Sequence, residues 1–256
     1  MLEPILASVR ARLGDVVARS DEWRGAAAGA PPARDFAGAL RVPGLSVIAE
    51  VKRRSPSAGV LASGLDPASR AVAYRDGGAA ALSVLTEPDH FAGAPEDLVV
   101  ARLAVDLPVL RKDFVLHPAQ VWQSRALGAD AVLLIAAILD DVLLRDLLGE
   151  ADAAGLAALV EVHDAAEAER AAAAGAGIVG VNNRDLRTFR VDLATAERLR
   201  PLLPDGAVTV AESGVSDPEA AARMADAGYD AVLVGEALVR AGDPARLVGA
   251  LRDAGS

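Results

Sequence analysis

The 256-residue sequence contains no cysteine, which excludes disulfide bonds, thiolate metal sites and a cysteine nucleophile. Lysine and asparagine are almost as scarce. Only Lys52 and Lys112 among the 26 basic residues are lysine, and Asn182 and Asn183 are the only asparagines. Because arginine supplies nearly every other cation, and because lysine is the basic side chain whose pKa can be tuned, the two lysines are candidates for chemistry.

The sequence also lacks the signals of membrane and nucleic-acid proteins. Its longest apolar run, AVLLIAAIL at 131–139, is much shorter than the roughly 18 residues of a transmembrane helix. The N-terminus carries early charges and no apolar core of a signal peptide. The net charge is −10, and the basic residues are scattered apart from KRR at 52–54. We therefore expect a cytoplasmic protein without membrane or nucleic-acid partners.

Hydrophobic residues, in contrast, make up 52% of the chain and are arranged in a recurring pattern. A glycine that ends a helix is followed by a short, continuous apolar run, as in ALGADAVLLIAA (126–137) and DAGYDAVLVGE (226–236). Continuous runs are typical of strands buried on both faces of a parallel sheet. Such runs begin near residues 46, 80, 108, 131, 157, 178, 208 and 231.

Alanine-rich helical stretches, such as 67–78 and 217–228, separate these runs. Eight strand–helix units in about 200 residues predict an α/β protein with a single (β/α)8 TIM barrel over residues 46–256. The alternative is an open doubly wound sheet, which more often carries a GxGxxG motif after its first strand; none is present here.

Residues 1–45 are predicted to form an N-terminal helical extension packed on the barrel. Apolar residues follow helical spacing at Leu2, Ile5, Leu6, Val9, Leu13 and Val16, and an Ala/Gly/Pro stretch follows at 25–33. A contact with a second copy of the chain is the alternative interpretation of this apolar face.

In a barrel of this kind the active site lies at the carboxyl ends of the strands. Polar or small residues follow seven of the predicted strands: Glu50, Lys52, Ser55 and Ser57; Thr86 and Glu87, with Phe91 beyond; Lys112 and Asp113; Glu161; Asn182, Asn183 and Arg184; Glu212, Ser213 and Gly214; Gly235 and Glu236. Both lysines and both asparagines thus fall on one rim, which indicates a functional site.

Alternation along the strands orients the charged residues of this rim. Glu50 and Lys52 are two positions apart and are expected to point inward together, as functional groups or as an ion pair that only ties the rim. Lys112 shares its parity with the apolar Leu110, so we expect Lys112 to point inward and Asp113 outward.

Two glycine-containing turns indicate phosphate binding, because the loops after the seventh and eighth barrel strands often hold a phosphate on backbone N–H groups. Ser213–Gly214 and Gly235–Glu236 lie at these two places. Simple tight turns are the alternative interpretation. Neither a metal nor a cofactor is indicated, because His90, His117 and His163 lack metal-ligand spacing and are expected to be loop residues.

Eight segments in order resemble those of indole-3-glycerol phosphate synthase, over essentially the whole barrel: AEVKRRSPSAG (49–59), ALSVLTEPDHFAG (81–93), PVLRKDF (108–114), GADAVLLIAAIL (128–139), LVEVHD (159–164), GVNNRDL (180–186), AESGV (211–215) and AVLVGEAL (231–238). The combination of EVKRRSPS, RKDF and NNRDL distinguishes this family from other barrels of the same pathway. The N-terminal helix is also similar in length to the extension of that family.

The resemblance implies ring closure of 1-(2-carboxyphenylamino)-1-deoxyribulose 5-phosphate to indole-3-glycerol phosphate, CO2 and water in tryptophan biosynthesis, without a cofactor. It implies that Lys112 is the acid for ring closure, that Glu161 is the base in dehydration, that Lys52 is a second acid and that Glu50 orients Lys52. An acid of this kind works best with a lowered pKa, which we expect for Lys112 from partial burial and from the charge of Lys52.

The resemblance also assigns the other rim residues. Further catalytic groups are Asn182 and Glu212; substrate-binding residues are Arg184, Phe91, Phe114 and Ser213; phosphate-binding residues are Ser55, Ser213, Gly214, Gly235 and Glu236. Two positions depart from some relatives, which carry Ser or Thr at 236 and Ser at 183. A glutamate at 236 is compatible with phosphate only if its carboxylate points away.

Two other functions remain possible interpretations of the residues. One is another phosphosugar barrel enzyme, such as an aminoaldose–ketose isomerase or a Schiff-base aldolase, although an isomerase of the phosphoribosylanthranilate type uses a cysteine base that is absent here. The other is a phosphate-binding scaffold without activity. The expected partner is a phosphorylated small molecule. The alternatives for assembly are a monomer, a weak homo-oligomer, or association with other enzymes of tryptophan synthesis.

Overall fold

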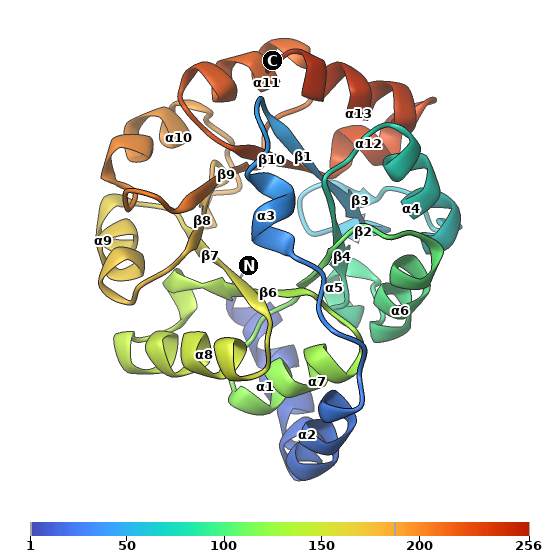
Figure 1. Ribbon diagram of the computed structural model, residues 1–256, viewed down its shortest axis with the longest axis vertical. Helices are drawn as coiled ribbons and strands as arrows, with labels where there is room; N and C mark the ends of the chain where they lie inside the picture. Colours follow the sequence, from blue (N-terminus) through green and yellow to red (C-terminus); the bar gives the residue numbers. More distant parts are fainter. Residues whose placement is uncertain (1, 187, 256) are drawn as a thin grey trace.

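Eight parallel strands close into a barrel in the computed structural model, which describes residues 2–186 and 188–255 (Figure 1). Their order around the barrel is β1-β10-β9-β8-β7-β6-β5-β4. The strands are β1 (Ser46–Val51), β4 (Ala81–Leu85), β5 (Val109–Lys112), β6 (Ala131–Ile135), β7 (Ala157–Val162), β8 (Ile178–Asn182), β9 (Val208–Glu212) and β10 (Ala231–Val234). The predicted (β/α)8 barrel is confirmed, and each strand begins within one residue of its predicted start. Met1 and Ser256, the outer bounds of the two predicted segments, lie outside the described residues.

Helices follow the strands and surround the barrel. They are α4 (Pro67–Asp76), α5 (Pro88–Phe91), α6 (Pro95–Ala104), α7 (Pro118–Ala126), α8 (Asp141–Ala153), α9 (Ala165–Ala173), α10 (Ala194–Leu199), α11 (Pro218–Asp226), α12 (Glu236–Arg240) and α13 (Pro244–Asp253), with 3-10 turns at Ala136–Ile138 and Arg200–Leu202. An antiparallel pair, β2 (Arg54–Ser55) and β3 (Gly59–Val60), follows β1. Aspartates fix five of these ten helix starts by accepting a backbone N–H with the side chain: Asp66, Asp140, Asp164, Asp217 and Asp243.

Alternate residues of the strands fill the interior of the barrel, and a short helix closes one of its two ends. Leu110, Leu159 and Val210 belong to a buried cluster inside the barrel that also contains Phe36 and Leu40. These two residues come from α3 (Phe36–Leu40), which lies across the centre of the barrel in Figure 1. Because α3 closes this mouth with apolar side chains, space for a ligand is left at the opposite end.

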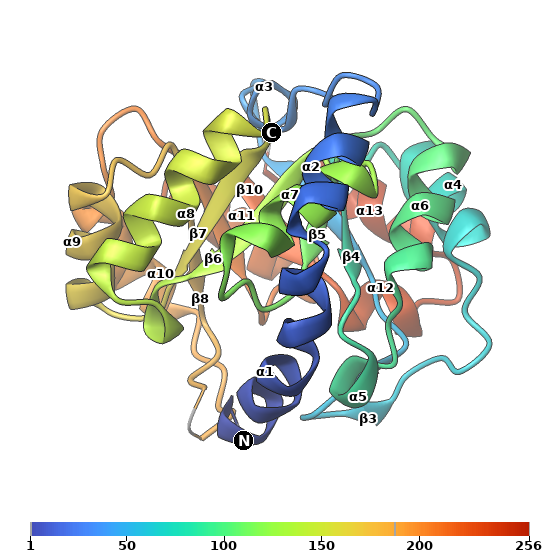
Figure 2. The ribbon, with the colours of Figure 1, turned by 90° about the horizontal axis from the view of Figure 1, so that it is seen from below.

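The N-terminal helices run along the side of the barrel from this plug to the other end (Figure 2). Helix α1 (Leu2–Ala18) covers the predicted amphipathic segment and buries Ile5, Leu6 and Val9. Helix α2 (Ser20–Ala28) packs on α7 and takes up the first part of the predicted Ala/Gly/Pro stretch, as the helix preference of alanine allows. Among the described residues no helix has the length and apolar character required to cross a membrane.

A buried aspartate joins the N-terminal segment to the barrel. Asp130, just before β6, accepts the backbone N–H groups of Arg34 and Val109, each at 2.8 Å. Its carboxylate also lies 3.0 Å from the guanidinium of Arg102 on α6. The side chain of Asp130 is fully buried, so these donors replace water completely.

We expect Asp130→Ala to lower the free energy of unfolding by about 3–5 kcal/mol, because it leaves a buried cation and two buried N–H groups without their acceptor. Urea denaturation measures this loss. The matched control is Asp106→Ala, which removes a fully exposed carboxylate 3.8 Å from Arg34 and should cost less than about 0.5 kcal/mol. Equal losses in the two variants would contradict the anchoring role of Asp130.

Candidate active site

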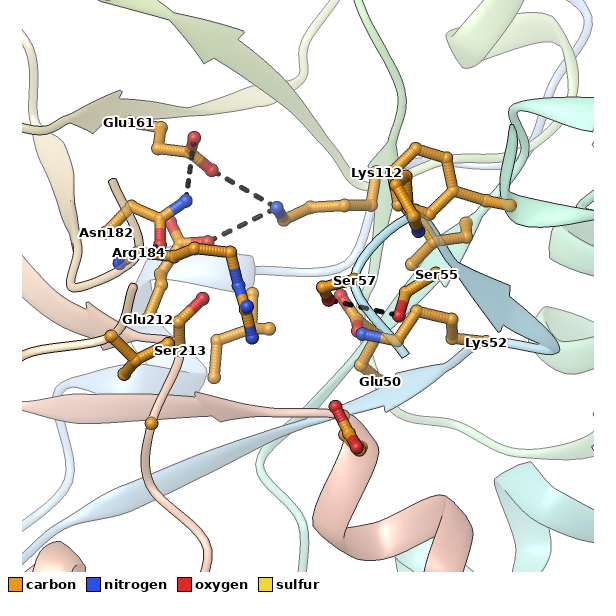
Figure 3. A pocket seen from close by; sticks show the side chains of 18 of the residues that line it. Glu50, Lys52, Ser55, Ser57, Lys112, Glu161, Asn182, Arg184, Glu212 and Ser213 are labelled. Carbon is orange, nitrogen blue, oxygen red and sulfur yellow. Dashed lines mark hydrogen bonds and ion pairs between the residues drawn. The ribbon is translucent and has the colours of Figure 1, made fainter. Parts of the chain in front are cut away.

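A cavity of about 570 Å³ opens at the carboxyl ends of the barrel strands. Its lining includes all of the residues predicted for the site: Glu50, Lys52, Ser55, Phe91, Lys112, Phe114, Glu161, Asn182, Arg184, Glu212, Ser213, Gly214, Gly235 and Glu236. Figure 3 shows the charged side chains converging from different strands on one space. Residues that are up to 186 positions apart in the chain therefore meet in one site.

The ammonium group of Lys112 lies at the centre of this cavity between two carboxylates (Figure 3). Its Nζ atom donates a hydrogen bond to Glu161 Oε2 at 3.2 Å and lies 3.3 Å from Glu212 Oε2. The inward direction of Lys112 agrees with its parity with Leu110. Asp113 turns instead to Arg111, at 3.0 Å.

The environment of Lys112 corrects one expectation from the sequence. Burial alone would lower the pKa of Lys112, but the nearby charges of Glu161, Glu212 and Glu50 outweigh burial and raise it well above its ordinary value. The expected lowered pKa is therefore wrong. The charge of Lys52 does not lower the pKa of Lys112 as expected, because the Nζ atom of Lys52 pairs with Glu50 Oε1 at 2.5 Å.

The two carboxylates beside Lys112 differ in their protonation. Burial would raise the pKa of Glu161, but Lys112, His163 and Asn182 hold it well below its ordinary value. Burial raises the pKa of Glu212 to about 8; the negative charge of Glu161 acts in the same direction, and Lys112 opposes it. At neutral pH Lys112 thus lies between one ionised carboxylate, Glu161, and one neutral carboxyl group, Glu212.

The neutral carboxyl group occupies a space left by a glycine. A Cβ atom at Gly180, on the neighbouring strand β8, would lie 2.2 Å from Glu212 Oε1. This oxygen is buried and makes no hydrogen bond to any residue that the structure describes. Such an atom is costly to bury unless a ligand completes its bonding, so Glu212 is poised for a substrate contact.

The Glu50–Lys52 pair forms a second charged group at the end of β1. Both side chains point into the barrel, as their parity predicts. The backbone of β1 is held here by the hydroxyl of Tyr74 on α4, which donates to the Glu50 carbonyl at 3.1 Å. A Cβ atom at Gly235 would lie 2.2 Å from Glu50 Oε1, so glycine at that position makes room for the pair.

Asn182 links Glu161 to the loop after β8. Its Nδ2 atom donates to Glu161 Oε1 at 3.1 Å, and its Oδ1 atom accepts the backbone N–H of Arg184 at 3.0 Å. The Arg184 guanidinium donates to the Phe189 carbonyl at 3.2 Å. Asn183, the other asparagine, is absent from the cavity lining because it donates to the Ser213 carbonyl and shapes the neighbouring loop.

The loop after β9 bends in a way that presents backbone groups to the cavity. Ser213 and Gly214 both have left-handed φ angles, 63° and 88°. A Cβ atom at Gly214 would lie 2.5 Å from Val191 Cγ1, so a larger residue does not fit there. Ser55, on β2, accepts the N–H of Ala58 at 3.1 Å and faces the same space.

The loop after β10 leads directly into a short helix. Gly235 precedes α12, and Glu236 is its first residue. The Glu236 carboxylate accepts a hydrogen bond from Arg240 Nε at 3.0 Å, one turn further along the helix. The carboxylate is thus engaged by a cation, although Glu236 and Arg240 both line the cavity, so the phosphate role of Glu236 stays a prediction.

The apolar wall of the cavity contains two phenylalanines that the sequence assigned to the site and two residues of α1 that it did not. The rings of Phe91 and Phe114 lie with their centroids 6.2 Å apart. Leu2 and Ile5 of α1 also line the cavity. Their apolar spacing indicated only a packing face, and nothing in that pattern shows which part of a helix reaches a ligand.

Two other residues near the rim, Glu87 and His163, are held by contacts within the protein. Glu87 is fully buried, accepts backbone N–H groups of α5 and pairs with Arg12 of α1 at 2.9 Å. His163 lies in the loop after β7, as expected, but its Nε2 atom is 3.3 Å from Glu161 Oε1. Within residues 2–186 and 188–255 no group of His, Asp or Glu side chains is arranged to hold a metal ion.

Comparisons with known proteins agree on one family. A family model described as "Indole-3-glycerol phosphate synthase" matches residues 2–251. A relative named indole-3-glycerol phosphate synthase from Parafrankia sp. is 52% identical, with 100% of this chain and 96% of the relative covered. A relative of the same name from Mycolicibacterium smegmatis is 50% identical, with 100% and 95% covered.

A solved structure supports the fold alone. Thiamine phosphate pyrophosphorylase from Pyrococcus furiosus matches with a TM-score of 0.61 at 19% sequence identity. The match covers 82% of this chain and 95% of that one. At this level of identity the similarity concerns the barrel and not its chemistry.

We expect Glu212→Gln to become more stable relative to the wild type as the pH rises. Glutamate in the unfolded chain ionises near 4.5, whereas Glu212 in the folded protein stays protonated up to about 8. Between these values the folded wild type binds the extra proton, so its free energy of unfolding falls with rising pH. Glutamine does not titrate and lacks this loss.

Urea denaturation of both proteins from about pH 5 to about pH 8 measures the difference. Glu219→Gln, on the exposed surface of α11, controls for the loss of a surface carboxylate. If the stability difference between Glu212→Gln and the wild type stays constant over this range, the conclusion that Glu212 is protonated in the folded protein is wrong.

Proposed function

Because this chain belongs to the indole-3-glycerol phosphate synthase family, we propose that it converts 1-(2-carboxyphenylamino)-1-deoxyribulose 5-phosphate to indole-3-glycerol phosphate, CO2 and water in tryptophan biosynthesis. One observation carries the proposal beyond membership of the family. A protonated Lys112 lies between an ionised Glu161 and a neutral Glu212 in a buried cavity, which supplies the acid and the base that this reaction needs.

Lys112 acts first as a general acid. The ring carbon that bears the carboxylate attacks the C2′ ketone, a carbon–carbon bond forms, and the carbonyl electron pair moves to oxygen. Lys112 Nζ gives its proton to this oxygen. The raised pKa of Lys112 keeps it protonated before the step, and transfer is still favourable because an alkoxide is a stronger base than an amine.

Loss of CO2 and of water completes the reaction. The carboxylate leaves as CO2, and the electrons of the broken bond restore the aromatic ring. The new hydroxyl then leaves as water. Lys52 is the acid that protonates it, and Glu161 is the base that removes a proton from the newly formed five-membered ring. Lys52 follows β1 and Lys112 ends β5, and Figure 3 shows their ammonium groups at separate places, so two acids can serve two oxygen atoms.

The remaining residues bind the substrate. Phosphate binding is proposed for Ser55 together with the backbone N–H groups of Ser213, Gly214, Gly235 and Glu236, since loops after the last two barrel strands suit an anion. The apolar walls suit the aromatic ring, and polar atoms near the central lysine suit its carboxylate and hydroxyls. These are the roles proposed for Phe91, Phe114, Asn182, Arg184 and Glu212.

We further propose that residues 1–45 are an extension of the barrel over 46–256 and not a separate domain, since Leu2 and Ile5 line the same cavity. A cytoplasmic location is proposed because the relatives are enzymes of biosynthesis. A monomer or weak homo-oligomer is proposed because most large exposed apolar side chains of the described residues, such as Val60 and Val142, lie singly on different elements.

We expect Lys112→Ala to reduce turnover by about 10²–10⁴-fold with little loss of folded protein, because it removes the acid of the first step. Indole fluorescence after mixing with the substrate, without metal or cofactor, measures turnover. Arg198→Ala removes an exposed cation that does not line the cavity and serves as the control. Near wild-type turnover in Lys112→Ala would exclude Lys112 from the mechanism.

We expect Lys52→Arg to slow dehydration more than decarboxylation, because arginine keeps the charge beside Glu50 but does not give up a proton. In a single turnover the variant should release CO2 at least about tenfold faster than it forms indole fluorescence. If both signals slow equally, Lys52 acts in binding and not as the acid of dehydration.

A further inference from the structure

His163 is held between two carboxylates at the edge of the site. It follows β7, two residues after Glu161, and its side chain is 13% exposed. Its Nε2 atom lies 3.3 Å from Glu161 Oε1, and its Nδ1 atom lies 3.0 Å from Glu167 Oε2 on α9. Nothing in the proposed mechanism uses this residue.

The geometry favours a doubly protonated imidazole. A neutral ring has one donor and one acceptor nitrogen, so one of its nitrogens would face a carboxylate with a lone pair. The imidazolium donates an N–H to Glu167 and places its positive charge beside Glu161. Because Nε2 lacks the alignment of a hydrogen bond to Glu161, this contact acts through charge rather than as a directed bond.

The orientation of the ring is fixed from the helix side. Glu167 Oε2 accepts both His163 Nδ1 and the backbone N–H of His163, the latter at 2.8 Å. Asp164 caps the start of α9 by accepting the N–H of Glu167 at 2.9 Å. Glu167 therefore aims the opposite nitrogen of the ring at Glu161.

The groups that face Glu161 come from three other strands and from the loop that follows β7. They are Lys112 on β5, Asn182 on β8, Glu212 on β9 and His163. In the proposed reaction Lys112 gives away its proton and then no longer balances the charge of Glu161. The imidazolium is then the one positive charge left among these groups.

We infer that His163, as an imidazolium held by Glu167, positions the Glu161 carboxylate and keeps it ionised while Lys112 is deprotonated. This inference rests on the proposed function, and it makes His163 a positioning residue rather than a catalytic one. The same two carboxylates outweigh the burial of the ring and raise the pKa of His163 to about 10, which agrees with the geometry.

The first test is the pH profile of kcat for His163→Gln, which keeps an N–H donor but loses the charge. Without the cation the pKa of Glu161 rises, so the acid limb of the profile should move up by about one pH unit or more. The value of kcat at neutral pH should fall about tenfold or more, with a smaller change in KM. His117→Asn, which replaces another loop histidine that caps α7, is the matched control and should leave the profile unchanged.

Glu167→Gln is a second variant that leaves His163 in place, and its acid limb should move in the same direction by a smaller amount. An acid limb that stays at the wild-type pH in both variants overturns the inference, whether or not kcat falls. In that case a wild type that still forms indole-3-glycerol phosphate leaves the proposed function intact. A wild type without turnover would instead remove the proposed function.

A measurement on the wild type does not depend on any variant folding. The chain has three histidines, so ¹⁵N NMR of the labelled protein can follow each imidazole ring. At about pH 8 one ring should remain an imidazolium, because two carboxylates stabilise that form. Three neutral rings at this pH would overturn the inference.

Discussion

A single buried ammonium group shared by two carboxylates is the constraint on which the site depends. Two carboxylates close to one cation in a buried cavity do not both stay ionised, since the second charge has no partner and little water. The groups around them decide the outcome: Glu161 has Asn182 and His163 and stays charged, whereas Glu212 has an unpaired oxygen and stays neutral. The difference between base and neutral carboxyl group is thus a property of the neighbours, because the two side chains are chemically identical.

The barrel makes this arrangement possible by holding each group on a separate rigid strand. Lys112, Glu161 and Glu212 lie at or next to the carboxyl ends of three different strands, and their positions follow from the closed register of the sheet. Small residues then supply the space, as Gly180 does beside Glu212. The apolar plug of α3 closes the other mouth, so the buried charges gather at one end of the barrel.

The sequence predicts the barrel well because its strands are buried on both faces and therefore appear as continuous apolar runs with sharp ends. It also predicts which residues gather around one cavity, because the scarcity of lysine and the parity of residues such as Lys112 are visible in one dimension, whereas their roles in the reaction stay predictions. The direction of the pKa of Lys112 was predicted wrongly, since it depends on Glu161 and Glu212, which lie 49 and 100 positions away. His163 was missed for the same reason: a lone histidine in a loop has no pattern, and its contact with Glu161 exists only in the folded protein.

The charge distribution also explains how a chain with a net charge of −10 can bind a substrate with a phosphate and a carboxylate. The acidic residues lie mostly on the surface, where water and salt screen them. Among the side chains that line the cavity this excess disappears, because Glu212 is neutral and the charges of Glu50 and Glu161 are balanced by Lys52 and Lys112. An anionic substrate therefore meets a nearly balanced set of charges rather than the net negative charge of the whole protein, and the low dielectric of the cleft strengthens its contacts with the cations.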